Sequence, residues 1–182
     1  MLHTFSGGGT DGSSPRGDLI LSGSTLYGVT NWGGPDNSGV AFSIDTSGSG
    51  FGLLHTFAGG LDDGANPRGT LTLVGSRLYG LTDNGGDDGL GVIFSMNIDG
   101  SDYRLEHEFA GGEGDGSHPY YTGMILDSSQ LPSLYLYGTS RLGGINNSGT
   151  VFVATPEPGV IALVGLGALT LALYRRKRKQ PS

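Results

Sequence analysis

The chain has 182 residues, of which 36 are glycine and none is cysteine. Glycine at about one residue in five, without a Gly-X-Y period, excludes collagen and favours β structure with many tight turns. The lack of cysteine excludes disulfides and thiolate metal sites. Residues 1–154 carry five arginines, no lysine and sixteen carboxylates, and this net charge of −11 argues against nucleic-acid binding.

The body of the chain is a tandem repeat with an offset of 52 residues. The offset relates His3, His55 and His107, each of which lies two residues before a phenylalanine. It also relates three Asp-Gly pairs and three prolines, and each unit ends with a Leu-Tyr-Gly motif, a Gly-Gly pair and a phenylalanine. Six extra residues precede the last Leu-Tyr-Gly. We therefore divide residues 1–154 into units 1–53, 54–105 and 106–154.

The residue pattern of each unit predicts four short strands, and it is clearest in the second unit. They are the His-x-Phe segment and residues 70–74, 77–82 and 91–96. Four antiparallel strands in about 50 residues match the size of a propeller blade of the kelch class. We therefore expect an all-β fold of three four-stranded antiparallel repeats, arranged like propeller blades.

The tail begins with a Pro156-Glu157-Pro158 motif, whose prolines end strand pairing. Residues 159–174 are uncharged and largely apolar. Sixteen helical residues span about 24 Å, which is less than the ~30 Å of a bilayer core. Length alone therefore leaves a membrane helix and a buried core helix equally open.

The five cations that follow decide in favour of the membrane helix. They are Arg175, Arg176, Lys177, Arg178 and Lys179. Such a cluster marks the cytoplasmic end of a spanning helix, and its long side chains reach the interface by snorkelling. The sequence predicts one transmembrane helix at 159–174, a basic cytoplasmic tail at 175–182 and the repeats outside the cytoplasm.

This tail, with its motif at 155–158, resembles the PEP-CTERM sorting signal of Gram-negative bacteria. The resemblance implies an exosortase-type processing enzyme as a partner, beside the lipid bilayer, and a place in the cell envelope or release to the surface after processing. The repeats resemble the GloVer-type tandem repeat through their Leu-Tyr-Gly-x-Thr, Gly-Gly and Gly-x-x-Phe patterns. The third unit departs from it with Ser140 where Thr30 and Thr82 stand. Neither resemblance implies a biochemical activity.

Three units are fewer than the four to eight blades of typical closed propellers, so an open or truncated arrangement is expected. Met1 lies one residue before the repeat begins, with no charged and apolar export segment ahead of it. Because the tail requires export, we expect the intact protein to start upstream of Met1.

Few polar residues suggest chemistry. The recurring histidines and the recurring aspartates Asp11, Asp63 and Asp115 are expected to be structural, since equivalent positions offer equivalent environments whereas catalysis needs different ones. Asp83, Asp87 and Asp88 form a weak calcium candidate, because the equivalent loops lack these carboxylates. Trp32, a loop aromatic in one unit only, is a candidate glycan contact.

These observations predict an exported β-repeat protein that binds or scaffolds at the surface, with extracellular polysaccharide as a candidate ligand. They predict no enzyme activity, no catalytic residue and no cofactor. The alternative from another class is a propeller-type enzyme, a glycan hydrolase or lyase.

Overall fold

The computed structural model describes residues 1–129 and 134–156, and all regular structure in these ranges is β. The first sheet contains β1 (Gly12–Pro15), β2 (Ile20–Ser22), β3 (Thr25–Gly33), β4 (Val40–Asp45) and β5 (Gly52–Thr56). The second contains β6 (Gly64–Pro67), β7 (Thr72–Val74), β8 (Arg77–Gly85), β9 (Val92–Asn97) and β10 (Arg104–Glu108). The third unit forms β11 (Gly116–Ser117), β12 (Ile125–Asp127), β13 (Tyr135–Ser140), β14 (Leu142–Gly143) and β15 (Thr150–Ala154).

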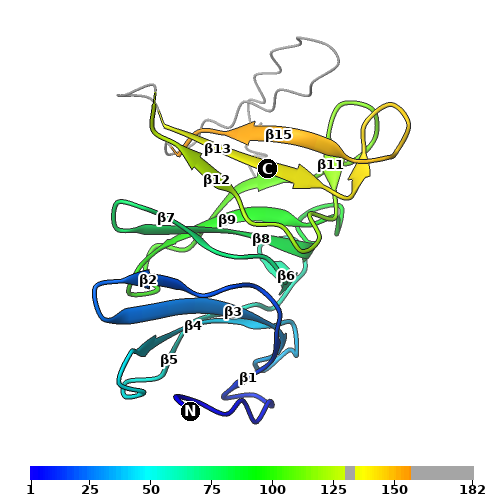
Figure 1. Ribbon diagram of the computed structural model, residues 1–182. Helices are drawn as coiled ribbons and strands as arrows, with labels where there is room; N and C mark the ends of the chain where they lie inside the picture. The colour runs from blue at the N-terminus through cyan, green and yellow to red at the C-terminus, as the bar shows by residue number, and fades with distance from the viewer. Residues whose placement is uncertain (130–133, 157–182) are drawn as a thin grey trace, which may run out of the picture.

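Every strand pair is antiparallel, and the sheets lie one above another from the N-terminus to the third unit (Figure 1). In the first sheet β1 and β2 both pair with β3, β1 along its second half and β2 along its first. β4 and β5 follow, so the sheet is four strands wide although it has five strands. The second sheet repeats this order, and the third unit divides into the pair β11–β14 and the sheet β12–β13–β15.

The last strand of each complete sheet comes from the next sequence repeat. β5 contains His55 and pairs with β4, and β10 contains His107 and pairs with β9. Residues 2–5, predicted as the equivalent first strand, do not form a strand. In the second and third units the equivalent segment pairs with the last strand of the unit before it, β4 or β9. Residues 64–67, which lie outside the strands predicted from the sequence, form β6, which pairs with the extended end of β8.

The hydrophobic core lies between successive sheets rather than within one sheet. One cluster joins the first two sheets and is built around Phe57, Leu78 and Phe94, none of which is exposed. A second joins the second sheet to the third unit around Ile93, Phe109 and Phe152. The second sheet therefore packs on both of its faces and the first sheet on one, as expected for strands whose side chains alternate between the two faces.

The glycine of the Leu-Tyr-Gly motif gives the core phenylalanine its place. A Cβ added to Gly80 would lie 2.4 Å from Cζ of Phe94, which sits directly opposite in β9. Phe94 in turn meets Phe57 edge to face, with ring centroids 5.1 Å apart. The same collision would occur at Gly28 with Phe42 and at Gly138 with Phe152, so each phenylalanine ring requires a glycine at this position of the motif.

The all-β, antiparallel prediction is confirmed, whereas a closed propeller is not present in the part of the chain that the structure describes. No helix among the described residues is long and apolar enough to cross a membrane. The transmembrane helix predicted at 159–174, the basic residues at 175–179 and the motif residues Glu157 and Pro158 lie outside the described residues.

Candidate functional site

The recurring histidines and aspartates form the same turn three times. Nε2 of His55 lies 3.1 Å from Oδ1 of Asp63, and the equivalent pairs are 3.2 Å and 3.0 Å apart in the first and third units. Asp63 also accepts hydrogen bonds from the backbone N–H groups of Ala58 and Gly64, at 2.8 and 2.7 Å. His55 stacks on the Tyr103 ring at 3.8 Å. These polar groups therefore fasten the last strand of one sheet to the start of the next.

The carboxylates of this turn make the stability of the fold depend on pH in the acid range. Burial raises the pKa of Asp63, but hydrogen bonds from His55, Tyr103 and the Ala58 backbone outweigh it, so the pKa lies below its ordinary 3.8. The pKa of Asp11 is lowered in the same way by the Ser6 and Gly12 N–H groups against burial. Each carboxylate then stabilises the fold fully above its ordinary pKa and loses this effect as the pH falls through the lower folded-state value.

We therefore expect the urea midpoint of unfolding to stay level from neutral pH to about pH 5 and to decrease below about pH 4. The variant Asp63→Asn lacks one of the titrating groups, so its midpoint should decrease less steeply in the acid range. An equally steep decrease in the variant would contradict this assignment. Circular dichroism at a series of pH values measures both curves.

A second set of contacts crosses between sheets at residues that precede the recurring prolines. Ser14, Asn66 and His118 all have a positive φ, between 50° and 57°. Non-glycine residues rarely adopt this conformation, and such strain is held by surrounding contacts. Here Asn66 Nδ2 donates to the backbone carbonyl of Asn31 at 3.1 Å, and His118 Nδ1 lies 2.8 Å from that of Asp83. Each sheet is thereby hydrogen-bonded to the one before it.

Arg68 lies in the middle of these contacts. Its Nε donates to Oδ1 of Asn31 at 2.7 Å, and its NH2 group lies 3.3 Å from Oδ2 of Asp83. Both partners of this ion pair are largely buried, with 13% and 10% of their side chains exposed. Arg68 is therefore held in one orientation by groups from two sheets.

Two tyrosines of the third unit gather further arginines around Arg68. The guanidinium carbon of Arg68 lies 4.2 Å from the ring centroid of Tyr120, and that of Arg141 lies 5.4 Å from the same ring. Arg16 lies 5.6 Å from the ring of Tyr121 and donates to its hydroxyl. The two rings meet edge to face, 4.2 Å apart. We call Arg16, Arg68, Tyr120, Tyr121 and Arg141 the arginine–tyrosine cluster.

The electrostatics of the cluster are positive. A hydrogen bond from Tyr120 and the positive charges of Arg16 and Arg68 hold the pKa of Tyr121 below its ordinary value. Of the three arginines in the cluster, Arg68 pairs with Asp83, whereas Arg16 and Arg141 have no ion pair within residues 1–129 and 134–156. Nδ2 of Asn31, beside Arg68, is buried without a hydrogen-bond partner. The cluster thus offers unpaired donors, which suit an anion or a hydroxyl-rich ligand.

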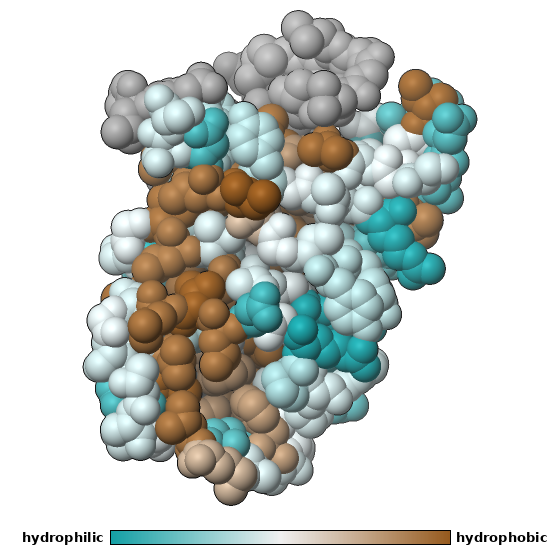
Figure 2. Space-filling model, viewed as in Figure 1, coloured by the Kyte–Doolittle hydropathy of each residue, from teal (hydrophilic) through white to brown (hydrophobic). Residues whose placement is uncertain are grey.

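The described part of the molecule also has an exposed apolar surface. Figure 2 shows an apolar band along one side of the molecule, with hydrophilic groups gathered next to it. Leu19, Leu21 and Ile125 contribute to the exposed apolar surface, at 51%, 58% and 74% exposure.

The residues predicted as candidate ligands do not come together. Asp83 is engaged by Arg68 and by His118, whereas Asp87 and Asp88 are exposed at the tip of their loop. Among the described residues no group of three His, Asp or Glu side chains is placed to hold a metal ion. Trp32 is 38% exposed in β3, on the opposite face of the strand from its neighbour Asn31.

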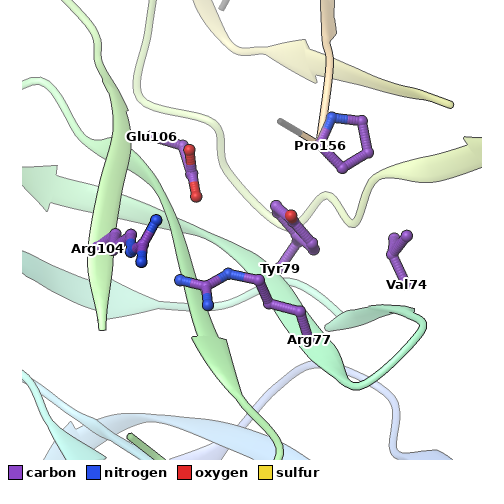
Figure 3. Close-up of a pocket in the computed structure, with 6 residues that line it drawn as sticks. All are labelled: Val74, Arg77, Tyr79, Arg104, Glu106 and Pro156. Carbon is purple, nitrogen blue, oxygen red and sulfur yellow. The ribbon is translucent and has the colours of Figure 1, made fainter. Parts of the chain in front are cut away.

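A cleft of about 300 Å³ lies between the second sheet and Pro156 (Figure 3). It is lined by Val74, Arg77, Tyr79, Arg104, Glu106 and Pro156. Arg77 and Arg104 share the carboxylate of Asp102, each at 2.8 Å, and the carboxylate of Glu106 lies in the same lining. Pro156, the first residue of the sorting motif, forms one wall of this cleft.

The family model for the Gloeobacter/Verrucomicrobia repeat matches residues 1–166. The chain belongs to this repeat family. The model of the PEP-CTERM protein-sorting motif matches residues 154–179, and both resemblances read from the sequence are thereby confirmed. This Gloeobacter/Verrucomicrobia repeat protein is therefore exported and sorted to the cell envelope, with an exosortase as the enzyme that recognises its tail.

Two solved structures are similar to this repeat protein. The tricorn protease matches with a TM-score of 0.46 and 17% identity over 85% of this chain and 13% of the protease. An ulvan lyase from a new family of polysaccharide lyases matches with a TM-score of 0.50 and 12% identity, over 86% of this chain and 40% of the lyase. The chain thus spans less than half the length of either protein, and the likeness to the lyase shows the fold alone. No curated protein matches the chain.

Sequence reasoning missed the arginine–tyrosine cluster of this repeat protein. A signal was nevertheless present in the repeat itself. Pro15-Arg16-Gly17 and Pro67-Arg68-Gly69 are identical, whereas the third unit has Pro119-Tyr120-Tyr121 at this position. A place where one repeat departs from the others is where a function specific to that unit can arise, but the sequence does not show that the three segments meet.

Proposed function

We propose that this protein is a non-catalytic surface protein that binds or scaffolds extracellular material, with polysaccharide as the ligand class. The observation that carries the proposal is a sorting motif at residues 154–179 that follows directly on a body of β-repeats. In this proposal residues 159–174 cross the membrane once, the cations at 175–179 remain in the cytoplasm, and the stacked sheets are propeller-like blades displayed outside.

The recurring carboxylates support a non-catalytic role. Asp11, Asp63 and Asp115 each accept hydrogen bonds from one histidine and two backbone N–H groups, at closely similar distances. Acid–base catalysis by two carboxylates requires environments that push their pKa values apart, whereas these three carboxylates have the same histidine and backbone partners.

Sorting is tested by replacing the motif. We expect Pro156→Ala, Glu157→Ala and Pro158→Ala together to leave the protein unprocessed in the cytoplasmic membrane of a host that has an exosortase, because the enzyme no longer recognises the tail. Cell fractionation and the mass of the mature chain measure this. Glu113→Ala, which removes an exposed loop carboxylate, is the matched control. A motif variant that is sorted and processed like the parent chain would contradict the proposal.

The absence of turnover is tested separately. The full-length chain is incubated with a panel of polysaccharides, and new reducing ends or unsaturated sugars are measured over time. We expect none above the level of a boiled sample. Turnover that is abolished by changing one carboxylate outside the repeated positions would favour the hydrolase or lyase alternative.

A further inference from the structure

The positive charges of the repeat body are concentrated although the body as a whole is acidic. Residues 1–154 have only five arginines and no lysine, and three of these arginines belong to the arginine–tyrosine cluster. The other two, Arg77 and Arg104, share Asp102 at a different place. Within the cluster Asp83 compensates Arg68, which leaves Arg16 and Arg141 as exposed guanidinium groups on either side of two tyrosine rings.

We propose that the arginine–tyrosine cluster binds an acidic polysaccharide through its carboxylate or sulfate groups. The inference rests on the proposed function and names the ligand class and the residues. Arg16 and Arg141 pair with anionic groups, because a guanidinium donates two parallel hydrogen bonds to a carboxylate or sulfate. Tyr120 and Tyr121 offer ring faces and hydroxyls to the sugar rings between those groups.

The stacking of the sheets gives the cluster a spacing that suits a polymer. Arg16 follows β1 and Arg68 follows β6, at equivalent positions of neighbouring sheets. Because Asp83 compensates Arg68, the exposed cations are Arg16 of the first unit, beside Tyr121, and Arg141 of the third unit, beside Tyr120. A polymer with regularly placed acidic groups can meet both of these cations at once, whereas a single free anion meets one. This multivalency favours a polysaccharide over a small anion.

The acidic remainder of the body does not prevent such binding. At physiological ionic strength charges are screened beyond about 8 Å, so the local arrangement decides. The carboxylates associated with the cluster are Asp83, already paired with Arg68, and Asp18, which follows Arg16 by two positions and whose backbone N–H donates to Thr70 at 3.0 Å.

The test titrates the full-length chain, in a neutral detergent, with three polymers: polygalacturonate, dextran sulfate and neutral dextran. We expect one or both acidic polymers to bind, with an affinity that decreases as salt is added, and neutral dextran to bind at least tenfold more weakly. Comparison of the two acidic polymers distinguishes carboxylate from sulfate recognition. Equal affinity for neutral dextran, or no binding of either acidic polymer at low salt, would overturn the inference.

A matched pair of charge variants locates the binding. Arg141→Gln should lower the affinity for the acidic polymer about tenfold, corresponding to the loss of one charge-assisted contact. Arg104→Gln removes the same charge from an arginine that is also exposed but lies outside the cluster, and it should leave the affinity unchanged within about twofold. Thermal unfolding confirms that both variants fold. Equal losses in both variants would show that only net charge matters and would refute the assigned site.

The failure of this inference is distinguishable from failure of the proposed function. Neutral polysaccharide binding that survives Arg16→Gln and Arg141→Gln would leave a binding role intact and remove only the acidic ligand. Defective sorting of the motif variant concerns the tail alone. Turnover of any polymer would instead contradict the non-catalytic role itself.

Discussion

Gly69→Ala is expected to lower the free energy of unfolding by about 3 kcal/mol or more, because the new methyl group has no room between two sheets. A Cβ at Gly69 would lie 1.6 Å from the backbone oxygen of Thr122 and 2.5 Å from its carbonyl carbon. Backbone atoms cannot rotate away as a flexible side chain can. The second sheet and the third unit must therefore separate at this point.

Gly52→Ala is the matched control for this prediction. Gly52 lies in β5 without a positive φ, and a Cβ there meets no atom within 4 Å. Alanine restricts the unfolded chain more than glycine does, so this variant should be unchanged or more stable by about 0.5 kcal/mol. Urea unfolding of the full-length chain measures both variants. If Gly69→Ala is as stable as Gly52→Ala, the close approach of the sheets at Gly69 is wrong.

Asp63→Ala is expected to be the other strongly destabilising change, by roughly 3 kcal/mol, because one side chain satisfies several donors. Without the carboxylate, the N–H groups of Ala58 and Gly64 and the imidazole of His55 lose their acceptor in a half-buried turn. This turn joins β5 of the first sheet to β6 of the second. Loss of the turn should therefore loosen the contact between the sheets as well as the loop.

The neighbouring aspartate provides the control. Asp62→Ala removes the same charge from an exposed position one residue earlier and should change stability by less than about 0.5 kcal/mol. Hydrogen exchange followed by mass spectrometry adds a local measurement. In peptides that cover 55–67 we expect faster exchange in Asp63→Ala than in the parent chain, and an unchanged exchange rate in Asp62→Ala. Similar exchange in both variants would show that the turn does not depend on the carboxylate.

Local features of the structure could be predicted from the sequence because they depend on neighbouring residues. The alternation of apolar residues at 70–74 predicts a strand that the structure contains as β7, and the Arg77 to Thr82 pattern predicts β8. β6 could not be predicted, because Gly64–Pro67 contains a proline and a left-handed Asn66. These residues form a strand only because the end of β8 lies alongside them.

The candidate site was beyond the reach of sequence patterns for a different reason. Arg16 and Tyr121 are 105 positions apart and meet only because the three units are stacked on one another. Asp83 resembles part of a calcium loop in the sequence, yet in the structure it faces Arg68 and His118 from two neighbouring segments. Contacts between sheets determine which charges remain unpaired, and local patterns in the sequence do not show those contacts.

The 52-residue repeat, the all-β class and the sorting tail can be read from the sequence alone, because turn glycines, strand periodicity and an apolar segment with terminal cations are local signals. The strand that completes each sheet, the place of the core and the arginines around Tyr120 and Tyr121 are seen only in the folded chain. The reason is that strand pairing and sheet stacking join residues that are distant in the chain. Their partners are fixed by packing and by backbone hydrogen bonds between units.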